Sequence, residues 1–589
     1  MILQILIKNR FIDLKYTNDK STQILISLLK AHGIKKVVAS PGTTNAIFVA
    51  SIQNDKDFEI YSSVDERSAA YIACGLSQKS GEPVVITCTE ATASRNYYPG
   101  LTEAYYRKLP ILAITGLHSE YNIGQLHTQA IDRSQTPKDT VKYSTTINHC
   151  NSKEDEWHVN FEINKALLEL TKNGGGPVHI NLQIGGRWDF YVDSLPNVRV
   201  IHRISYMDDK PELPKGKIAI VIGAHKRMTS KEIEAIDHFC ASNNGVVFAD
   251  IISGYYGKYR VNASILQAQS CYSSTVRHAN LMIHIGEIGW TSAVAPQTWR
   301  VSEDGELRDT YHNLTYHFDM DLCTFFNLYK REENTQNTYY KECIDEVESI
   351  ITKIPELPFS NAWIAQHTVS ELPIGCIFHT GILNSFRVWN YYLYDPSIET
   401  SCNFGGFGID GGLSTLIGSS IGCPEKIHFG VFGDLAFFYD MNVIGNRHVG
   451  NNVRILLINN GKGNEFRNCI HPAYKLREDA DLFIAAAGHY GNKSNKLVRH
   501  YAEDLGYQYL SAVNKTEYLA NMNEFLTPKP KDRPIIFEVF TDTKDESEAL
   551  FLLSHIVSDS SKSLFHTVKD TVRSVVGDKG IHTLKNLIK

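Results

Sequence analysis

The amino-acid sequence predicts an α/β protein built from three doubly wound parallel-sheet domains, with a short helical tail at its C-terminal end. Short apolar runs alternate with amphipathic stretches along most of the 589 residues, which is typical of buried parallel strands joined by helices. Two segments rich in glycine, proline or polar residues, 184–215 and 353–359, interrupt this alternation. Since domains usually contain about 100–200 residues, three domains fit the length.

The apolar runs mark the strands of each domain. In the first domain they are Lys35–Ser40, Val84–Thr87, Ile111–Thr115 and Val178–Leu182. In the second they begin at Lys217 and continue with Val246–Asp250 and Leu281–Gly286. In the third they are Ile427–Phe432, Val453–Ile458 and Pro534–Val539. We therefore expect domains at 18–188, 200–352 and 360–545, followed by the helical tail at 546–589.

Composition narrows the classes of function. The net charge is −6 and no long basic run occurs, so nucleic acid is not an expected partner. The eleven cysteines form no Cys-x-x-Cys pair, which argues against a zinc or redox motif and indicates a reducing compartment. There is no run of about 18 uncharged apolar residues and no convincing signal peptide. We expect a cytoplasmic protein without a membrane segment.

The strongest local signal lies in the third domain, where two apolar strands end in polar residues. Asp434 follows the first of these strands, and Asn460 follows the next one, 26 positions later. A carboxylate, an amide oxygen and the backbone carbonyl of Lys462 would supply the oxygen ligands that Mg²⁺ prefers, usually beside a phosphate. The alternative is a pair of ordinary turns at strand ends.

The residues next to Asp434 also suit an anion. Gly433 would let the chain approach a phosphate closely. The helix that follows would direct the N–H groups of its first residues, such as Leu435 and Ala436, toward the same anion. Because open α/β sheets bind ligands at this edge, the pattern predicts a site for a phosphate group held through a metal ion.

The spacing and its flanks resemble a known family. A Gly-Asp pair, an interval of about 25–30 residues and an Asn-Asn pair after a strand resemble the binding motif of enzymes that use thiamine diphosphate (ThDP). The segments Gly433–Asn442 and Gly408–Thr415 resemble those of the SEPHCHC synthase family. The resemblance implies that Asp434 and Asn460 ligate Mg²⁺ at the diphosphate of ThDP.

The same resemblance assigns roles in the Gly-rich turn before the Asp434 strand. Ile409 would bend ThDP into a V shape, and the backbone carbonyl near Phe407 would face its 4′-amino group. The match covers about residues 20–185 and 360–545, whereas the middle domain matches only in its α/β character. Because the two halves of ThDP bind different subunits in this superfamily, a homodimer or homotetramer is implied.

The first domain offers a carboxylate that could activate the cofactor. Glu66 lies where a short strand, Glu59–Ser63, meets a helix rich in small residues, Ala69–Leu76. By position alone, a carboxylate stabilised by a helix N-terminus explains this residue. The segment Val64–Ala70 nevertheless resembles the one that carries the activating glutamate of the family. The resemblance implies that a buried Glu66 holds a proton at the pyrimidine ring of ThDP.

Further segments of the first and third domains supply candidates for the site. Two that resemble the cofactor-binding loops of the family are Ser40-Pro41-Gly42 and Arg95–Pro99, which includes Asn96. Gln129 matches an active-site glutamine of the family. The acid–base candidates are His118, His127 and Glu465. Histidine titrates near neutral pH, and Glu465 could return a proton after decarboxylation. Each of these four could instead be an ordinary loop residue.

The expected substrate pocket departs from the family, whose members bind several carboxylates with arginines. Basic positions are replaced or displaced at Thr43-Thr44, His118, Phe404, the segment with Arg387 and Trp389, and Gly286–Ser292, and Glu90 replaces a small residue. Each lost charged hydrogen bond costs about 1.5–3 kcal/mol. We therefore expect an acceptor less anionic than isochorismate, such as a nucleotide-linked keto sugar or an aldehyde.

Taken together, these residues predict a ThDP- and Mg²⁺-dependent enzyme that decarboxylates a small 2-oxo acid and transfers the acyl anion to an acceptor. Alternatives are simple decarboxylation, authentic SEPHCHC synthase activity and a degenerate binding subunit. The last is weakened by the presence of Glu66, Asp434 and Asn460. A nicotinamide enzyme is disfavoured because no Gly-x-Gly-x-x-Gly follows a first strand.

Overall fold

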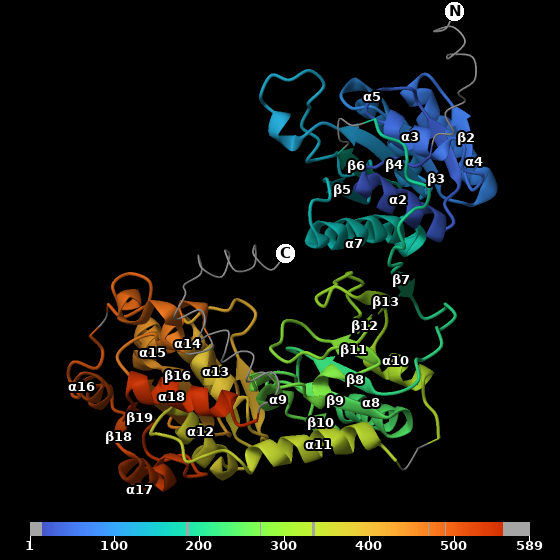
Figure 1. The fold of residues 1–589 in the computed structure, drawn as a ribbon. Coiled ribbons are helices and arrows are strands. Elements are labelled where there is room, and N and C mark those ends of the chain that lie inside the picture. Colours follow the sequence, from blue (N-terminus) through green and yellow to red (C-terminus); the bar gives the residue numbers. More distant parts are fainter. Residues whose placement is uncertain are drawn as a thin grey trace, which may run out of the picture. The chain divides into compact units, whose positions relative to one another are not determined.

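The computed structural model describes residues 15–183, 188–270, 272–332, 336–468, 471–488 and 490–557 (Figure 1). Parallel strands joined by helices form its sheets, which confirms the predicted α/β fold with three parallel-sheet domains. The chain divides into two compact units. The first contains residues up to 208 together with 304–319, and the second contains 209–303 together with the residues from 320 onward.

The first unit contains a six-stranded sheet in the order β2-β1-β3-β4-β6-β5. Its strands are β1 (Lys36–Ala39), β2 (Glu59–Ser62), β3 (Val84–Cys88), β4 (Ile111–Leu117), β5 (Tyr143–Ile147) and β6 (Val178–Gln183). The chain passes from β1 to β2 on one side and later returns to the other side of β1 as β3. Parallel sheets bind ligands at the carboxyl ends of strands at such a switch point.

Helices cover both faces of this first sheet. They are α2 (Lys20–Ala31), α3 (Ala46–Ile52), α4 (Glu66–Ser80), α5 (Thr92–Asn96), α6 (Tyr98–Tyr106) and α7 (Lys153–Glu169), with short 3-10 turns η1 (Glu120–Asn122) and η2 (Lys172–Gly174). Val37 joins the apolar cluster that includes α2 and α7, and Val38 joins the cluster that includes α4 and α6. Adjacent residues of β1 are thus buried on opposite faces, which explains its continuous apolar run.

The first sheet of the second unit has the order β10-β9-β8-β11-β12. Its strands are β8 (Ile218–Ile222), β9 (Gly245–Ala249), β10 (Arg260–Val261), β11 (Leu281–Ile285) and β12 (Thr298–Val301). The associated helices are α8 (Ser230–Asn243), α9 (Ala263–Ala268), η3 (Thr275–Arg277), α10 (Leu322–Leu328) and α11 (Thr338–Ile351). Here the strand order reverses between β8 and β11.

The last sheet, also in the second unit, has the order β15-β14-β16-β17-β19-β18. Its strands are β14 (Ile377–Thr380), β15 (Glu399–Cys402), β16 (His428–Gly433), β17 (Val453–Asn459), β18 (Gln508–Ala512) and β19 (Ile535–Phe540). Its helices are α12 (Asn361–Thr368), α13 (Asn384–Trp389), α14 (Gly412–Gly422), α15 (Asp434–Asp440), α16 (Leu497–Asp504), α17 (Lys515–Phe525) and α18 (Thr543–Ser554), with 3-10 turns η4 (Val369–Glu371), η5 (Met441–Gly445), η6 (Asn464–Arg467) and η7 (Pro472–Asp481). The order reverses between β14 and β16.

The structure corrects the sequence prediction in several places. In the first unit β7 (His202–Ile204), which pairs with β13 (Leu314–Phe318), lies inside segment 184–215, where only a break was expected. The strands β5, β15 and β18 were missed because most of their residues stay partly exposed. The strands β10, β12, β13 and β14 were also missed, although β12 and β14 are mostly buried. The expected tail begins within α18, and its part beyond residue 557 lies outside the described residues. The domain boundaries given above remain predictions.

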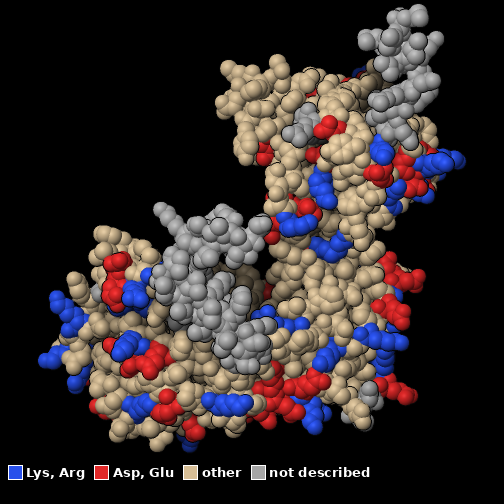
Figure 2. Space-filling view, viewed as in Figure 1, with Lys and Arg blue, Asp and Glu red and all other residues tan. Residues whose placement is uncertain are grey.

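The surface carries charges of both signs. Figure 2 shows Lys and Arg side chains interspersed with Asp and Glu on the face in view. No single-sign patch dominates this face. Within the described ranges, no helix is both long and apolar enough to cross a membrane.

Candidate active site

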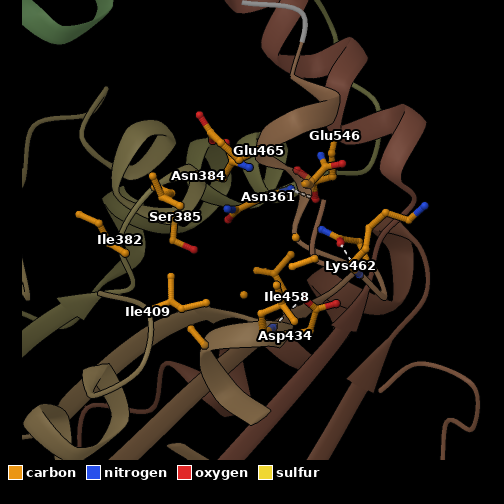
Figure 3. Close-up of a pocket in the computed structure, with 18 of the residues that line it drawn as sticks. Asn361, Ile382, Asn384, Ser385, Ile409, Asp434, Ile458, Lys462, Glu465 and Glu546 are labelled. Atoms are coloured by element: carbon orange, nitrogen blue, oxygen red, sulfur yellow. Dashed lines mark hydrogen bonds between the residues drawn. The ribbon is translucent and has the colours of Figure 1, made fainter. Parts of the chain in front are cut away.

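A cavity of about 250 Å³ lies at the switch point of the last sheet (Figure 3). Its wall combines residues that follow β14 with residues that follow β16 and β17. Those residues include Ile382, Asn384, Ser385, Gly433, Asp434, Leu435, Ala436, Asn460, Lys462 and Glu465. The structure therefore brings the predicted diphosphate and metal residues together in one cavity.

Asp434 provides the buried carboxylate of this cavity, with only 2% of its surface exposed. It is the first residue of α15 and accepts hydrogen bonds from the backbone N–H groups of Leu435, at 2.7 Å, and Gly461, at 2.5 Å. Burial nevertheless raises the pKa of Asp434 to about 7. Since a neighbouring cation favours the ionised form, this carboxyl group suits a metal ligand.

The other two predicted ligands lie just beyond β17. The side-chain oxygen of Asn460 accepts a hydrogen bond from the backbone N–H of Lys462 at 3.3 Å, and Lys462 Nζ is paired with Asp481 at 2.8 Å. In the part of the chain that the structure describes, no group of three or more His, Cys, Asp or Glu side chains could hold a metal ion. A site made of one carboxylate, one amide, one backbone carbonyl and phosphate oxygens matches Mg²⁺.

The cavity leaves room for an anion beside Asp434. A Cβ atom added to Gly433 would meet no atom within 4 Å, so a side chain at this position would project into open space. Glycine therefore keeps that space free next to the carboxylate, as the predicted approach of a phosphate requires.

The Gly-rich turn between β15 and α14 reaches the same cavity. Ile409 lines it (Figure 3). Phe407 adopts a φ of 54°, a backbone conformation that is strained for a residue with a side chain. Its half-exposed ring packs edge-on against the buried ring of Phe404, 5.6 Å away. The turn is thus held in a defined strained shape, and the roles of Phe407 and Ile409 at ThDP remain predictions.

In the first unit, Glu66 is the first residue of α4 and is half-buried in the single chain. Asp65 caps the helix by accepting the N–H of Ser68 at 3.1 Å. Asn96 donates to Glu66 Oε2 at 3.5 Å, so two residues predicted to bind the cofactor meet. Nearby positions of β2, of α4 and of the turn between them expose large apolar side chains: Tyr61, Val64, Tyr71 and Ile72.

The loop after β1 lies at the switch point of the first sheet. Ser40, Pro41 and Gly42 line a second cavity there. A Cβ atom on Gly42 would lie only 2.8 Å from Cβ of Thr89, in the loop after β3. Only glycine allows the two loops to approach this closely. The predicted cofactor loop and the β3 loop therefore form one surface.

Glu90 and His118 form a pair at the carboxyl ends of β3 and β4. Nδ1 of His118 contacts the Glu90 carboxylate, and the His118 backbone N–H donates to Glu90 Oε2 at 3.1 Å. Arg133 lies 4.0 Å from the same carboxylate and donates to the carbonyl of Gly116 at 2.6 Å. Glu90 is only 1% exposed. The sequence pointed to Glu90 and His118 separately and missed both the pairing and Arg133.

Gln129 and His127 lie on the long loop between η1 and β5 and are exposed in the single chain. Gln129 has a φ of 67°. Neither residue lines the cavity near Asp434 or the one near Ser40. The acid–base role of His127 and the active-site role of Gln129 remain predictions.

The cavity near Asp434 contains residues that sequence reasoning missed. Glu546 of α18 is 5% exposed, accepts hydrogen bonds from Asn361 N at 2.9 Å and Thr541 Oγ1 at 2.7 Å, and has its pKa raised to about 7 by burial. Asn464 is 6% exposed, and neither atom of its amide has a hydrogen-bond partner. No local motif marks either residue, because only the fold brings α18 and η6 to the switch point.

The three parallel-sheet domains form the fold of a ThDP-dependent enzyme, and comparisons with known proteins agree. Residues 19–136 match the family model described as thiamine pyrophosphate enzyme, N-terminal TPP binding domain. A 2-succinyl-5-enolpyruvyl-6-hydroxy-3-cyclohexene-1-carboxylate synthase of Phocaeicola vulgatus is 30% identical over 559 residues, which cover 91% of this chain and 98% of that relative. Proteins of the same name from Bacteroides thetaiotaomicron (30% over 559 residues, covering 91% of this chain and 98% of the relative) and Flavobacterium johnsoniae (26% over 558 residues, covering 90% and 97%) are also similar.

The chain is therefore a ThDP-dependent enzyme. It belongs to the 2-succinyl-5-enolpyruvyl-6-hydroxy-3-cyclohexene-1-carboxylate (SEPHCHC) synthase family, as the sequence motifs implied. Its residues fit the cofactor, since a buried carboxylate, a nearby amide oxygen and open space beside Gly433 meet in one cavity.

Proposed function

We propose that this enzyme removes CO₂ from a small 2-oxo acid and transfers the acyl anion to an acceptor, using ThDP and Mg²⁺. The cavity that unites Asp434, Asn460 and Lys462 at the switch point of the last sheet carries the proposal. When bound, ThDP supplies the carbon nucleophile and the electron sink that decarboxylation next to a carbonyl group requires.

The chain's own residues hold the cofactor in two parts. Asp434, Asn460 and the carbonyl of Lys462 would bind Mg²⁺ and, through it, the diphosphate. Ile409 would support the cofactor from the Gly-rich turn. In this arrangement, residues at the last sheet would bind the cofactor, and a residue of the first unit, Glu66, would hold or move the proton.

Glu66 would hold a proton at the pyrimidine ring. The hydrogen bond from Asn96 orients its carboxyl group. Because Glu66 is only half-buried in one chain, a partner surface must cover it before desolvation can favour its protonated form. This requirement links the proposed chemistry to a homodimer or homotetramer.

The function is tested by cofactor binding and by CO₂ release. The apo protein is titrated with ThDP in the presence and absence of Mg²⁺, and the loaded enzyme is then given a panel of 2-oxo acids. We expect Mg²⁺-dependent binding and CO₂ release from at least one small 2-oxo acid. Absence of ThDP binding would leave only the degenerate binding subunit, and CO₂ release with aldehyde as the sole product would favour a simple decarboxylase.

Mg²⁺-dependent ThDP binding is expected to weaken by about tenfold when the pH falls from 8 to 6. The reason is that Asp434 must lose its proton to ligate a metal, and burial holds its pKa at about 7. The folding stability of the apo protein should depend on pH in the opposite direction. Between about pH 4 and 7 the folded state keeps the Asp434 proton, whereas the unfolded state releases it. The contribution of Asp434 to the free energy of unfolding therefore falls as the pH rises through this range. Titration calorimetry at pH 6, 7 and 8 measures the first effect.

A homodimer is expected in solution, with twice the mass of one chain by light scattering. Replacement of the exposed Ile72 by glutamate should shift the mass toward that of a monomer, because a charge would be buried in an apolar contact. Activity should fall in parallel. Lys56→Glu, at another exposed position of the first unit, serves as the control and should keep the dimer. An active monomer would contradict an active site shared between two subunits.

We also propose a cytoplasmic location for the protein.

A second candidate is the reaction named in the relatives, the formation of 2-succinyl-5-enolpyruvyl-6-hydroxy-3-cyclohexene-1-carboxylate, with 2-oxoglutarate as donor and isochorismate as acceptor. The similarity over nearly the full length favours it. The replaced basic positions, among them Thr44, His118 and Phe404, favour a less anionic acceptor. Turnover of isochorismate with 2-oxoglutarate at ordinary enzymatic efficiency would decide for the relatives' reaction.

A further inference from the structure

A closed ion pair borders one side of the Asp434 cavity, where Glu465 lines the wall. Arg387 of α13 donates two hydrogen bonds to Glu465 of η6, from NH2 to Oε1 at 2.8 Å and from NH1 to Oε2 at 3.0 Å. Arg387 also donates to the side chain of Asn384. The side chain of Arg387 is 6% exposed and that of Glu465 is 19% exposed. Both oxygens of Glu465 thus occupy the planar fork with which arginine otherwise recognises a carboxylate.

Glu465 and Asp434 lie in different parts of the same cavity wall. Asn384 and Glu465 line the cavity together with Asp434. Figure 3 shows Asp434 and Glu465 on opposite sides of the open space. The diphosphate end and the Glu465 end are therefore two separate parts of one cavity.

An aromatic ring covers the arginine from its other side. The guanidinium carbon of Arg387 lies 5.3 Å from the ring centroid of Trp290. Trp290 is fixed by the buried Asp250, whose Oδ2 accepts the backbone N–H groups of Trp290 at 2.6 Å and Thr291 at 2.9 Å. The guanidinium is thus held between a ring and a carboxylate, and it has little freedom to turn toward a ligand.

No spare cation faces the cavity among the residues that the structure describes along its wall. Lys462 is the one lysine or arginine in that wall, and its ammonium group is paired with Asp481. An acceptor carboxylate would have to displace Glu465 from Arg387 and would leave two anions side by side in a partly buried space. Both effects penalise an anionic acceptor.

What the cavity offers instead is a neutral polar group. The amide of Asn464, next to Glu465, is buried and has no partner for its oxygen or its nitrogen. A buried amide in this state costs free energy unless a ligand satisfies it. It can donate to and accept from hydroxyl or carbonyl oxygens, which carry no charge.

We propose that Glu465 sets the substrate class by locking Arg387 against Trp290, so that the enzyme takes an uncharged, hydroxylated aldehyde or ketone as acceptor and rejects carboxylates at this position. The inference rests on the proposed carboligase function. It assigns Glu465 to specificity, where the sequence suggested proton transfer. Asn464 is the group that recognises the acceptor oxygens.

The test measures binding of succinate, a dicarboxylate probe, so that it does not depend on turnover. Wild-type protein loaded with ThDP and Mg²⁺ should show no succinate binding beside Trp290 at millimolar succinate, although its donor position must accept a 2-oxo acid. Glu465→Gln frees the Arg387 fork and should tighten succinate binding by about 10- to 100-fold, which corresponds to one charge-assisted hydrogen-bonded pair. Titration calorimetry gives the affinity, and quenching of Trp290 fluorescence, absent in Trp290→Phe, locates the binding.

Three controls make the result specific. Glu465→Gln combined with Arg387→Met should lose the gain in succinate affinity. Glu465→Asp keeps the charge and should keep wild-type exclusion. Glu478→Gln alters a surface glutamate whose side chain is 87% exposed and should change nothing. Equal succinate affinity in wild type and Glu465→Gln, with both proteins folded by circular dichroism, would overturn the proposal.

The two levels of inference can fail separately. If the protein does not bind ThDP, the carboligase function fails, yet the succinate titration can still be read on the apo protein. If it binds ThDP and releases CO₂ but Glu465→Gln gains no affinity for succinate, only the role of Glu465 fails. With an active enzyme, the ratio of kcat/KM for a neutral sugar aldehyde over an anionic aldehyde should fall in Glu465→Gln.

Discussion

Replacement of Glu66 by glutamine is expected to lower the rate of decarboxylation by about 10²- to 10⁴-fold, the usual contribution of a positioned proton-transfer group. Glutamine keeps the size of the side chain and can still contact Asn96, but it cannot release a proton to the pyrimidine ring or take one from it. ThDP affinity should change by less than tenfold, because Asp434 and the proposed metal site in the second unit are untouched. Steady-state kinetics and titration calorimetry measure the two quantities on the same preparation.

The matched control is Glu59→Gln, which alters an exposed glutamate of β2 in the same unit. This variant should retain activity. Hydrogen exchange at the C2 position of bound ThDP gives a readout that a structural defect would not mimic, and it should slow in Glu66→Gln but not in Glu59→Gln. A Glu66→Gln enzyme with wild-type turnover would show that the activating carboxylate lies elsewhere, with the buried Glu90 as the next candidate.

Most of the central strands were predictable because both faces of a parallel sheet are buried, although β12 and β14, which are also interior and mostly buried, were not predicted. Val37 and Val38 of β1 belong to different apolar clusters, one on each face of the sheet, so β1 reads as a continuous apolar run. Strands at sheet edges lack this signal: β18 keeps four of its five residues at least partly exposed. β7 has only three residues. For such strands the pairing partner, which the local sequence does not contain, decides the conformation.

The contacts in the candidate site also fall into two groups, those that the sequence could predict and those that it could not. Asp434 and Asn460 end strands that are neighbours in both sequence and sheet, so their meeting could be inferred from the strand pattern. Arg387 and Glu465 belong to connections after two different strands, β14 and β17, that are not adjacent in the sheet. A charge pair between such connections has no spacing rule, and the sequence therefore suggested a lost arginine and a free acid where the structure has one closed pair.

Glu546 is a residue of the candidate site that the sequence did not reveal. It reaches the Asp434 cavity from α18, near the end of the described chain, where the sequence predicted only a helical tail. Its hydrogen bonds to Asn361 and Thr541 hold α18 against α12 and the end of β19. Two buried carboxyl groups, Asp434 and Glu546, thus share one cavity. Burial raises the pKa of each to about 7, and repulsion from Asp434 adds to the rise at Glu546. A divalent cation held by Asp434 would relieve this repulsion, which a neutral ligand could not do.

Replacement of Asp434 by asparagine is therefore expected to weaken Mg²⁺-dependent ThDP binding by at least about 100-fold and to abolish turnover at ordinary cofactor concentrations. The variant loses the one charged ligand of the proposed metal site, at a cost of several kcal/mol in a buried setting.

The folding stability of the Asp434→Asn variant should not fall by a similar amount. At pH 8 the wild-type apo protein carries an ionised Asp434 whose pKa burial has raised to about 7, so the neutral asparagine removes a buried charge while it gives up part of the hydrogen bonding to Leu435 and Gly461. The melting temperature of the apo variant at pH 8 should thus stay near that of wild type, whereas the stabilisation by ThDP and Mg²⁺ seen in wild type should disappear. Asp479→Asn, at an exposed position of the same unit, should keep both. Among the described residues that line this cavity, Asp434 is the buried carboxylate next to Gly433. Retention of the Mg²⁺-dependent thermal shift in Asp434→Asn would therefore mean that the cofactor is anchored elsewhere.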